Sequence, residues 1–150
     1  MQQNLRSEAA KLLAVFTTGA FSYGIIEICA RGFTHISMGL LGGLAMYLIH
    51  LLNRSGRTAP SVFLTLMISA LFITACELIT GEIVNRQLGL NVWDYSMMPM
   101  NFDGQICLPF TLIWFALSAV GIMLDDLMRK KLFGEQRDIL FLQSSGRTAV

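Results

Sequence analysis

The sequence predicts an all-α fold, a bundle of four transmembrane helices, and three observations support this. Of the 150 residues, 54% are hydrophobic and only 14% are charged, whereas a soluble domain has roughly 45–50% apolar and about 25% charged residues. The mean hydropathy is +0.58. Four apolar stretches each approach the roughly 20 residues that cross a bilayer as a helix. This composition argues against a soluble enzyme, a disordered chain and a secreted disulfide scaffold.

The predicted spans cover about 12–30, 36–52, 61–84 and 105–124. Helices are expected because hydrocarbon leaves no solvent partner for exposed backbone groups. Residues 1–134 would form the membrane domain, and 135–150 a mobile cytoplasmic tail. The first span could instead be a cleaved signal peptide, but it carries polar residues and lacks a convincing cleavage site.

Basic residues predict that both chain ends are cytoplasmic. Under this topology nine of the 11 basic residues lie inside, and Arg31 and Arg86 lie outside. Cytoplasmic loops carry an excess of Lys and Arg, which supports the N-in, C-in arrangement. The inner nine are Arg6, Lys11, Arg54, Arg57, Arg129, Lys130, Lys131, Arg137 and Arg147. The net charge of +1 offers no broad basic surface for nucleic acid.

Small residues mark where helices could approach closely. Gly39 and Gly43 are four residues apart on the second span, with Gly42 beside them, and Ala20 and Gly24 form a similar pair on the first. Such pairs let helix backbones meet in lipid, either inside one bundle or between protomers.

The three cysteines are expected to be packing residues. Cys29, Cys76 and Cys107 fall near predicted outer ends of spans, but no CxxC or Cys/His spacing accompanies them. The pattern therefore predicts no metal site and no cofactor.

Acidic residues at membrane depth are the most informative polar groups. Glu27 and Glu77 lie late in the first and third spans, where a carboxylate must be paired, neutralised or set against water. Glu27 and Arg31, like Glu82 and Arg86, are four residues apart and should share one helix face. Glu77 has no basic residue three or four positions away.

These acids and their neighbours would gather at the outer side of the bundle. The sequence predicts an outward-facing substrate- or ion-binding site there, because acidic residues inside membranes usually have a functional role. In the alternative interpretation the Glu–Arg pairs only fix helix ends. The candidate site residues are Glu27, Arg31, His35, Glu77, Glu82 and Asp94.

The segment 91–102 is too polar and broken to span a membrane. Trp93 and Tyr95 suit the headgroup region, while Pro99 and Gly104 interrupt continuous helix. We expect an interfacial or shallow re-entrant loop that caps the outer end, or a simple aromatic anchor.

At the other end, Asp125 and Asp126 precede Arg129 and Lys130 by four residues each. This spacing predicts a solvated helix end held by local ion pairs. A metal-binding or catalytic acid pair is the alternative.

Several segments resemble the bacterial family described as Putative ABC-transporter type IV, or CmpB-like. The resemblance covers roughly 20–126. Its most specific part is the loop with Trp93, Asp94, Tyr95 and Ser96, followed by Pro99, Asn101, Gly104, Gln105 and Trp114; further matching segments are 31–38 and Glu77 with Gly81 and Asn85. The resemblance implies a multi-span protein of the bacterial plasma membrane. Glu27, Arg31, His35, Glu77 and Asp94 match family-like positions. Glu82 rests only on its spacing from Arg86, and Asp103 only on its place in the outer connector between the third and fourth spans.

The leading functional hypothesis is a membrane component of a transport system, forming an oligomer or partnering an ATPase. The sequence contains no G-x-x-x-x-G-K-[ST] phosphate loop, so an ATPase would be a separate chain. A non-transport accessory or scaffolding protein is the second hypothesis. A membrane enzyme is the third, and no catalytic motif supports it.

Overall fold

The computed structural model describes residues 2–53 and 60–135, with side chains from residue 8 onward. The described elements, in chain order, are α1 (Gln2–Arg31), α2 (Ile36–Leu52), α3 (Val62–Gly81), the π-helix η1 (Glu82–Gln87), β1 (Asn101–Phe102), β2 (Ile106–Cys107) and α4 (Leu108–Lys131). The described part is therefore α-helical, with four α-helices as expected, apart from one short antiparallel hairpin.

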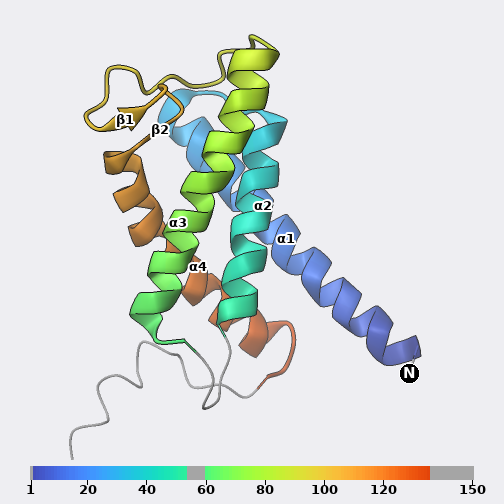
Figure 1. Ribbon diagram of the computed structural model, residues 1–150. Helices are drawn as coiled ribbons and strands as arrows, with labels where there is room; N and C mark the ends of the chain where they lie inside the picture. The colour runs from blue at the N-terminus through green and yellow to red at the C-terminus, as the bar shows by residue number, and fades with distance from the viewer. Residues whose placement is uncertain (1, 54–59, 136–150) are drawn as a thin grey trace, which may run out of the picture.

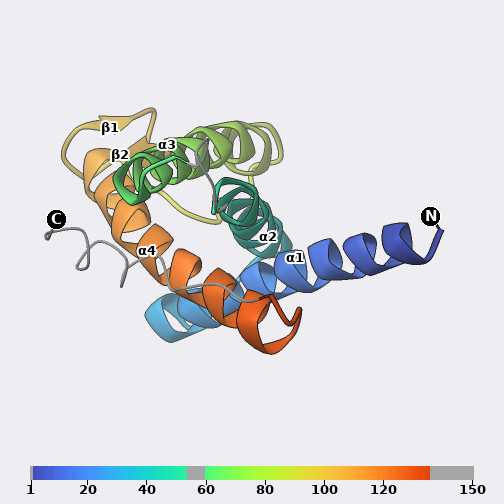
Figure 2. The same cartoon turned by 90° about the horizontal axis from the view of Figure 1, so that it is seen from below.

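Consecutive helices run in opposite directions (Figure 1). The turn after α1, the π-helix η1 and the hairpin lie at one end of the molecule, which we call the loop end. The ends of α2 and α4 and the start of α3 lie at the other, which we call the basic end because Arg129, Lys130 and Lys131 form the last turn of α4. Viewed from below, the four helices surround a common centre (Figure 2).

Local signals explain where the helices begin and end. α1 ends before Gly32, whose φ of +79° suits glycine. The His35 side chain accepts a hydrogen bond from Ser37 N at the start of α2, and Ser61 Oγ accepts one from Leu64 N at the start of α3. Pro109 lies in the first turn of α4, where no partner is needed for a backbone N–H.

Within residues 2–53 and 60–135, three helical segments are long and apolar enough to cross a membrane: Glu8–Arg31, Val62–Gln87 and Leu108–Lys131. α2 is also apolar but has 17 residues, about 25 Å at the α-helical rise, so its crossing stays a prediction. Large apolar side chains face outward, with Phe21 69% and Phe63 66% exposed. Such a surface requires lipid around it, and the molecule is a multi-pass membrane protein.

α1 and α2 share the most extensive helix contact in the described structure, and glycines lie at it. A Cβ atom on Gly42 would lie 2.7 Å from Gly19 O, and one on Gly43 would lie 2.5 Å from the Phe16 ring. Gly19 and Gly42 therefore allow the two backbones to approach closely, and Gly43 leaves space for the Phe16 ring. Gly39 and Gly24 have no tight neighbour and lie on an outward groove instead.

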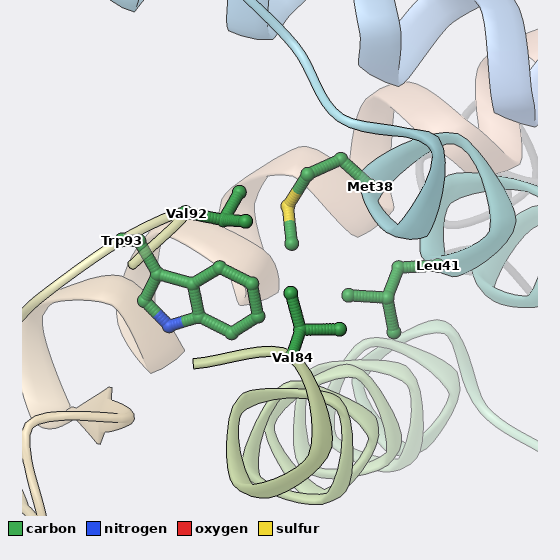
Figure 3. Close-up of a cluster of buried hydrophobic side chains, with 5 residues drawn as sticks. All are labelled: Met38, Leu41, Val84, Val92 and Trp93. Carbon is green, nitrogen blue, oxygen red and sulfur yellow. The ribbon is translucent and has the colours of Figure 1, made fainter. Parts of the chain in front are cut away.

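A cluster of buried side chains closes the loop end. Met38 and Leu41 of α2 contact Val84 of η1 and the loop residues Val92 and Trp93 (Figure 3). These residues are 2–7% exposed. The loop is therefore anchored on the bundle by apolar packing as well as by hydrogen bonds.

Candidate functional site

Glu77 lies inside the bundle near the loop end and is only 2% exposed. The Trp114 indole N–H donates a hydrogen bond to one carboxyl oxygen over 2.7 Å, and the Tyr95 hydroxyl donates to the other over 3.2 Å. These contacts join α3, α4 and the loop at one carboxyl group. A carboxyl can be buried when its oxygens are hydrogen-bonded in this way.

Tyr95 reaches Glu77 from the loop because its ring stacks on Phe110 of α4, with centroids 4.4 Å apart. Burial, followed by the charge of Glu77, raises the pKa of Tyr95. Its hydroxyl therefore keeps its proton and donates to Glu77 throughout the physiological pH range. The loop thus contributes directly to the environment of the buried acid.

A hydrogen-bond network fixes the path of the loop. The Asn85 side chain accepts from Val92 N over 2.7 Å and donates to Trp93 O over 3.1 Å and to Gln105 Oε1 over 2.9 Å. The Trp93 indole N–H donates to Gln105 O over 2.9 Å. Gly81 permits this arrangement because its missing Cβ leaves space for the Gln105 side chain. The network is buried, so it orders this part of the loop against η1.

A cavity of about 100 Å³ adjoins Glu77 at the centre of the four helices. Tyr23 of α1 and Trp114 of α4 form part of its wall, and their ring centroids are 5.6 Å apart. Ser22 and Ser118 are further polar residues in a wall made mostly of apolar side chains. Glu77 is the acidic residue that lines this space.

Glu27 and Arg31 form the predicted ion pair on α1. Arg31 also donates a hydrogen bond to Val92 O over 2.8 Å, which ties α1 to the loop. No ion pair joins Arg31 to Glu77 in the described structure. The Glu27–Arg31 pair therefore does not neutralise the buried acid by contact.

The other predicted acids lie apart from Glu77. Glu82 pairs with Arg86 over 2.9 Å, and Arg86 also pairs with Asp103 over 3.0 Å. All three side chains are well exposed, so this is a surface cluster at the loop end. It fixes η1 to the hairpin and does not reach the cavity.

Local turns build the part of the loop that carries the family resemblance, from Asp94 to Gly104. The carboxylate of Asp94 accepts hydrogen bonds from Ser96 N over 2.8 Å and from Ser96 Oγ over 3.1 Å. Asn101 donates to Ser96 O over 3.0 Å and accepts from Gly104 N over 3.2 Å. Asp94 and His35 therefore serve as caps of a turn and of α2, and neither lines the cavity.

The basic end differs from the sequence prediction of a solvated helix end. Asp125 and Arg129 do form the predicted pair, over 2.7 Å, but Asp125 is 0% and Arg129 8% exposed. His50 of α2 lies 2.5 Å from Asp125, and Asn53 donates to both Asp125 and Asp126 over 2.8 Å. The prediction was wrong because His50 of α2 and Asn53, the residue that caps its C-terminus, face α4 and replace water around the acids.

Arg129 extends this network beyond α4. Its guanidinium donates to His50 O over 2.7 Å and to Glu135 over 2.9 Å, and Glu135 also pairs with Lys11 of α1 over 3.4 Å. The network thus links three helices at the basic end. In the described ranges, no group of three or more His, Cys, Asp or Glu side chains is placed to hold a metal ion. The three cysteines are free thiols.

Spacing along the chain could not reveal the partners of Glu77. Trp114 is 37 residues away and Tyr95 is 18 residues away. His50 was missed at the basic end for the same reason, since Asp125 is 75 residues further along. The available signal is the cost of burying a charge, which predicts polar partners for Asp125 as it does for Glu77.

The family model described as Putative ABC-transporter type IV matches residues 11–140. This range includes the four helices after the first turns of α1, the loop and the Glu77 cavity. The chain therefore belongs to this family. No curated protein and no solved structure matches the chain.

Proposed function

We propose that this protein is a permease-like subunit of a transport system in the bacterial plasma membrane. Its four α-helices would all cross the bilayer, with the N- and C-termini in the cytoplasm and the loop end outside. The substrate or ion would pass through the central cavity beside Glu77. A separate ATPase chain or further copies of this chain would complete the transporter.

The burial of Glu77 in a cavity between all four helices carries this proposal. A bundle that only filled space would place apolar side chains at such a position, because an intramembrane acid is costly. Here the acid is 2% exposed and borders about 100 Å³ of unfilled space. Transporters place such groups along the path of their substrates.

In this proposal the loop itself acts as the gate on the outer side of the cavity. Tyr95 links the loop to Glu77, and Arg31 links the loop to α1 through Val92 O. Movement of the loop would break these contacts and open the loop end of the cavity. Glu27 would hold the Arg31 guanidinium in place during this movement.

Cysteine reactivity tests the proposed path. Ser118 lines the cavity and is 1% exposed, whereas Leu112, on the same helix, is 61% exposed on the outer surface. In a variant with its three native cysteines changed to alanine, each position is changed to cysteine and treated with a water-soluble methanethiosulfonate in native membranes. Thiols react as thiolates, which need water.

A transport path predicts that Ser118→Cys reacts on the order of tenfold faster than Leu112→Cys, because lipid keeps the second thiol protonated. Equal and slow reaction at both positions would remove the proposed path.

A second candidate function is that of an accessory or scaffolding membrane protein, in which several copies of this chain assemble. One observation favours it: an outward groove between α1 and α2 is lined by Ala20, Gly24 and Gly39. Small residues on a lipid-facing surface allow another helix to approach closely. This role is compatible with transport, since four helices are few for a complete permease.

A further inference from the structure

Among the described residues, the Glu77 carboxyl group has hydrogen-bond donors but forms no ion pair with a cation. Trp114 and Tyr95 each donate to one oxygen. The guanidinium of Arg31 is engaged by Glu27 and by Val92 O, and no ion pair with Glu77 occurs among the described residues. A carboxylate in this position would be stabilised by a positive charge placed in the adjoining cavity.

Aromatic rings add to this preference for a cation. Tyr23 and Trp114 both line the cavity, and their ring centroids lie 5.6 Å apart. The faces of these rings carry partial negative charge and attract ammonium groups, most strongly when water is excluded. Acid and rings therefore favour the same sign of charge.

The size and lining of the cavity restrict the ligand further. About 100 Å³ leaves room for a compact molecule with few heavy atoms. The wall offers few oxygen atoms besides Glu77, Ser22 and Ser118, whereas hard metal cations require six or more oxygen ligands. The apolar remainder of the wall suits hydrocarbon groups.

We propose that the cavity binds small alkylammonium ions, with the ammonium group at Glu77 and the alkyl groups against the apolar wall. This inference rests on the proposed function and names the substrate class of the same cavity. Tyr23 and Trp114 would contact the cation through their ring faces. Ser22 and Ser118 would accept hydrogen bonds from ammonium groups that carry protons.

Calorimetric titration of the protein in nanodiscs of phosphatidylcholine tests this assignment. The probes are tert-butylammonium and tert-butanol, which have nearly the same shape but differ in charge. We expect tert-butylammonium to bind and tert-butanol to bind on the order of tenfold or more weakly. Glu77→Gln should remove this difference, whereas the control Asp103→Asn, at an exposed site, should keep it.

A second variant covers the case in which Glu77→Gln does not fold. Ala45 lines the cavity, and Ala45→Leu would fill part of it while leaving the acid in place. We expect this variant to lose tert-butylammonium binding. Equal affinity for both probes in the native protein, or unchanged tert-butylammonium binding in either folded variant, would overturn the proposal.

The result separates the substrate class from the transport role. If Ser118→Cys reacts rapidly but tert-butylammonium does not bind, the path stands and the alkylammonium class is wrong. If tert-butylammonium binds in a Glu77-dependent manner but Ser118→Cys is unreactive, the ligand class stands and the transport path is wrong.

Discussion

The indole N–H of Trp114 lies 2.7 Å from a carboxyl oxygen of Glu77, which joins α4 to α3 inside the helix bundle. This contact sets the position of the carboxyl beside the central cavity, because Trp114 and Glu77 both line it. The Tyr95 hydroxyl adds a longer contact, of 3.2 Å, from the loop. Glu77 is thus a common point of two helices and the loop.

Removal of the Trp114 donor should destabilise the protein more than removal of the Tyr95 donor. Trp114→Phe retains an aromatic ring but loses the shorter hydrogen bond to a buried acid, a cost of about 1–3 kcal/mol. Tyr95→Phe should cost less because its hydrogen bond is longer and its side chain only half-buried. Denaturant titration in mild detergent, followed by circular dichroism, measures both. A larger loss for Tyr95→Phe would contradict the assigned order.

Substitution of the buried Asp125 should destabilise the protein much more than substitution of the exposed Lys130 nearby on α4. Asp125→Ala would leave the buried His50 and Arg129 without their shared acceptor, which costs about 3–5 kcal/mol when a buried pair is broken. Lys130 is exposed on the same turn, so Lys130→Ala should change stability by less than about 0.5 kcal/mol. The same titration compares them. Similar small losses would mean that Asp125 is solvated after all.

Substitution to alanine should destabilise the protein more at Gly104 than at Gly89, although both residues have the same backbone conformation. Gly104 and Gly89 have φ values of +67° and +66°. A Cβ on Gly104 would lie 2.9 Å from Asp94 Oδ1, whereas one on Gly89 meets nothing within 4 Å. Both alanine variants should lose about 1–2 kcal/mol from the left-handed conformation, and Gly104→Ala should lose about 1–3 kcal/mol more by overpacking. Equal losses in thermal unfolding would argue against the close loop packing.

Leucine substitutions at two glycines on different faces of α2 should have different effects, one on folding and the other on self-association. Gly42→Leu would push α1 away, since a Cβ there meets Gly19 O, and it should lower the yield of folded protein. Gly39→Leu would fill the outward groove and should leave the monomer folded but weaken self-association. Sedimentation equilibrium in detergent, with cross-linking in membranes, gives the oligomeric state. An unchanged oligomer in Gly39→Leu would exclude this groove as the interface.

The sequence predicted the helices because apolar runs of about 20 residues leave few alternatives. The bounds of α2, Ile36–Leu52, agree with the second predicted stretch. α4 continues to Lys131, beyond the predicted end at residue 124, because Asp125, Asp126 and Arg129 are satisfied by α2 and by one another. Hydropathy recognises apolar residues, and it cannot recognise charged residues that fold inward together.

Contacts within one helix could also be predicted, whereas those between elements could not. The pairs Glu27–Arg31 and Glu82–Arg86 follow from spacing alone. The sequence analysis expected the outer acids to gather in one site. In the structure Glu82 and Asp94 interact with surface groups, whereas Glu77 lies inside the bundle. The partners of Glu77 depend on how α3, α4 and the loop pack, which periodicity does not specify.

The most direct test of transport through the Glu77 cavity is the sidedness of the reaction at Ser118→Cys. The protein is placed in sealed vesicles with known orientation, and a membrane-impermeant methanethiosulfonate is added to one face at a time. A path through the membrane predicts that the reagent reaches this cysteine from either face, whereas Leu112→Cys reacts from neither. Reaction from one face only would show a closed pocket, and no reaction from either face would show a sealed core; each would contradict a transport path.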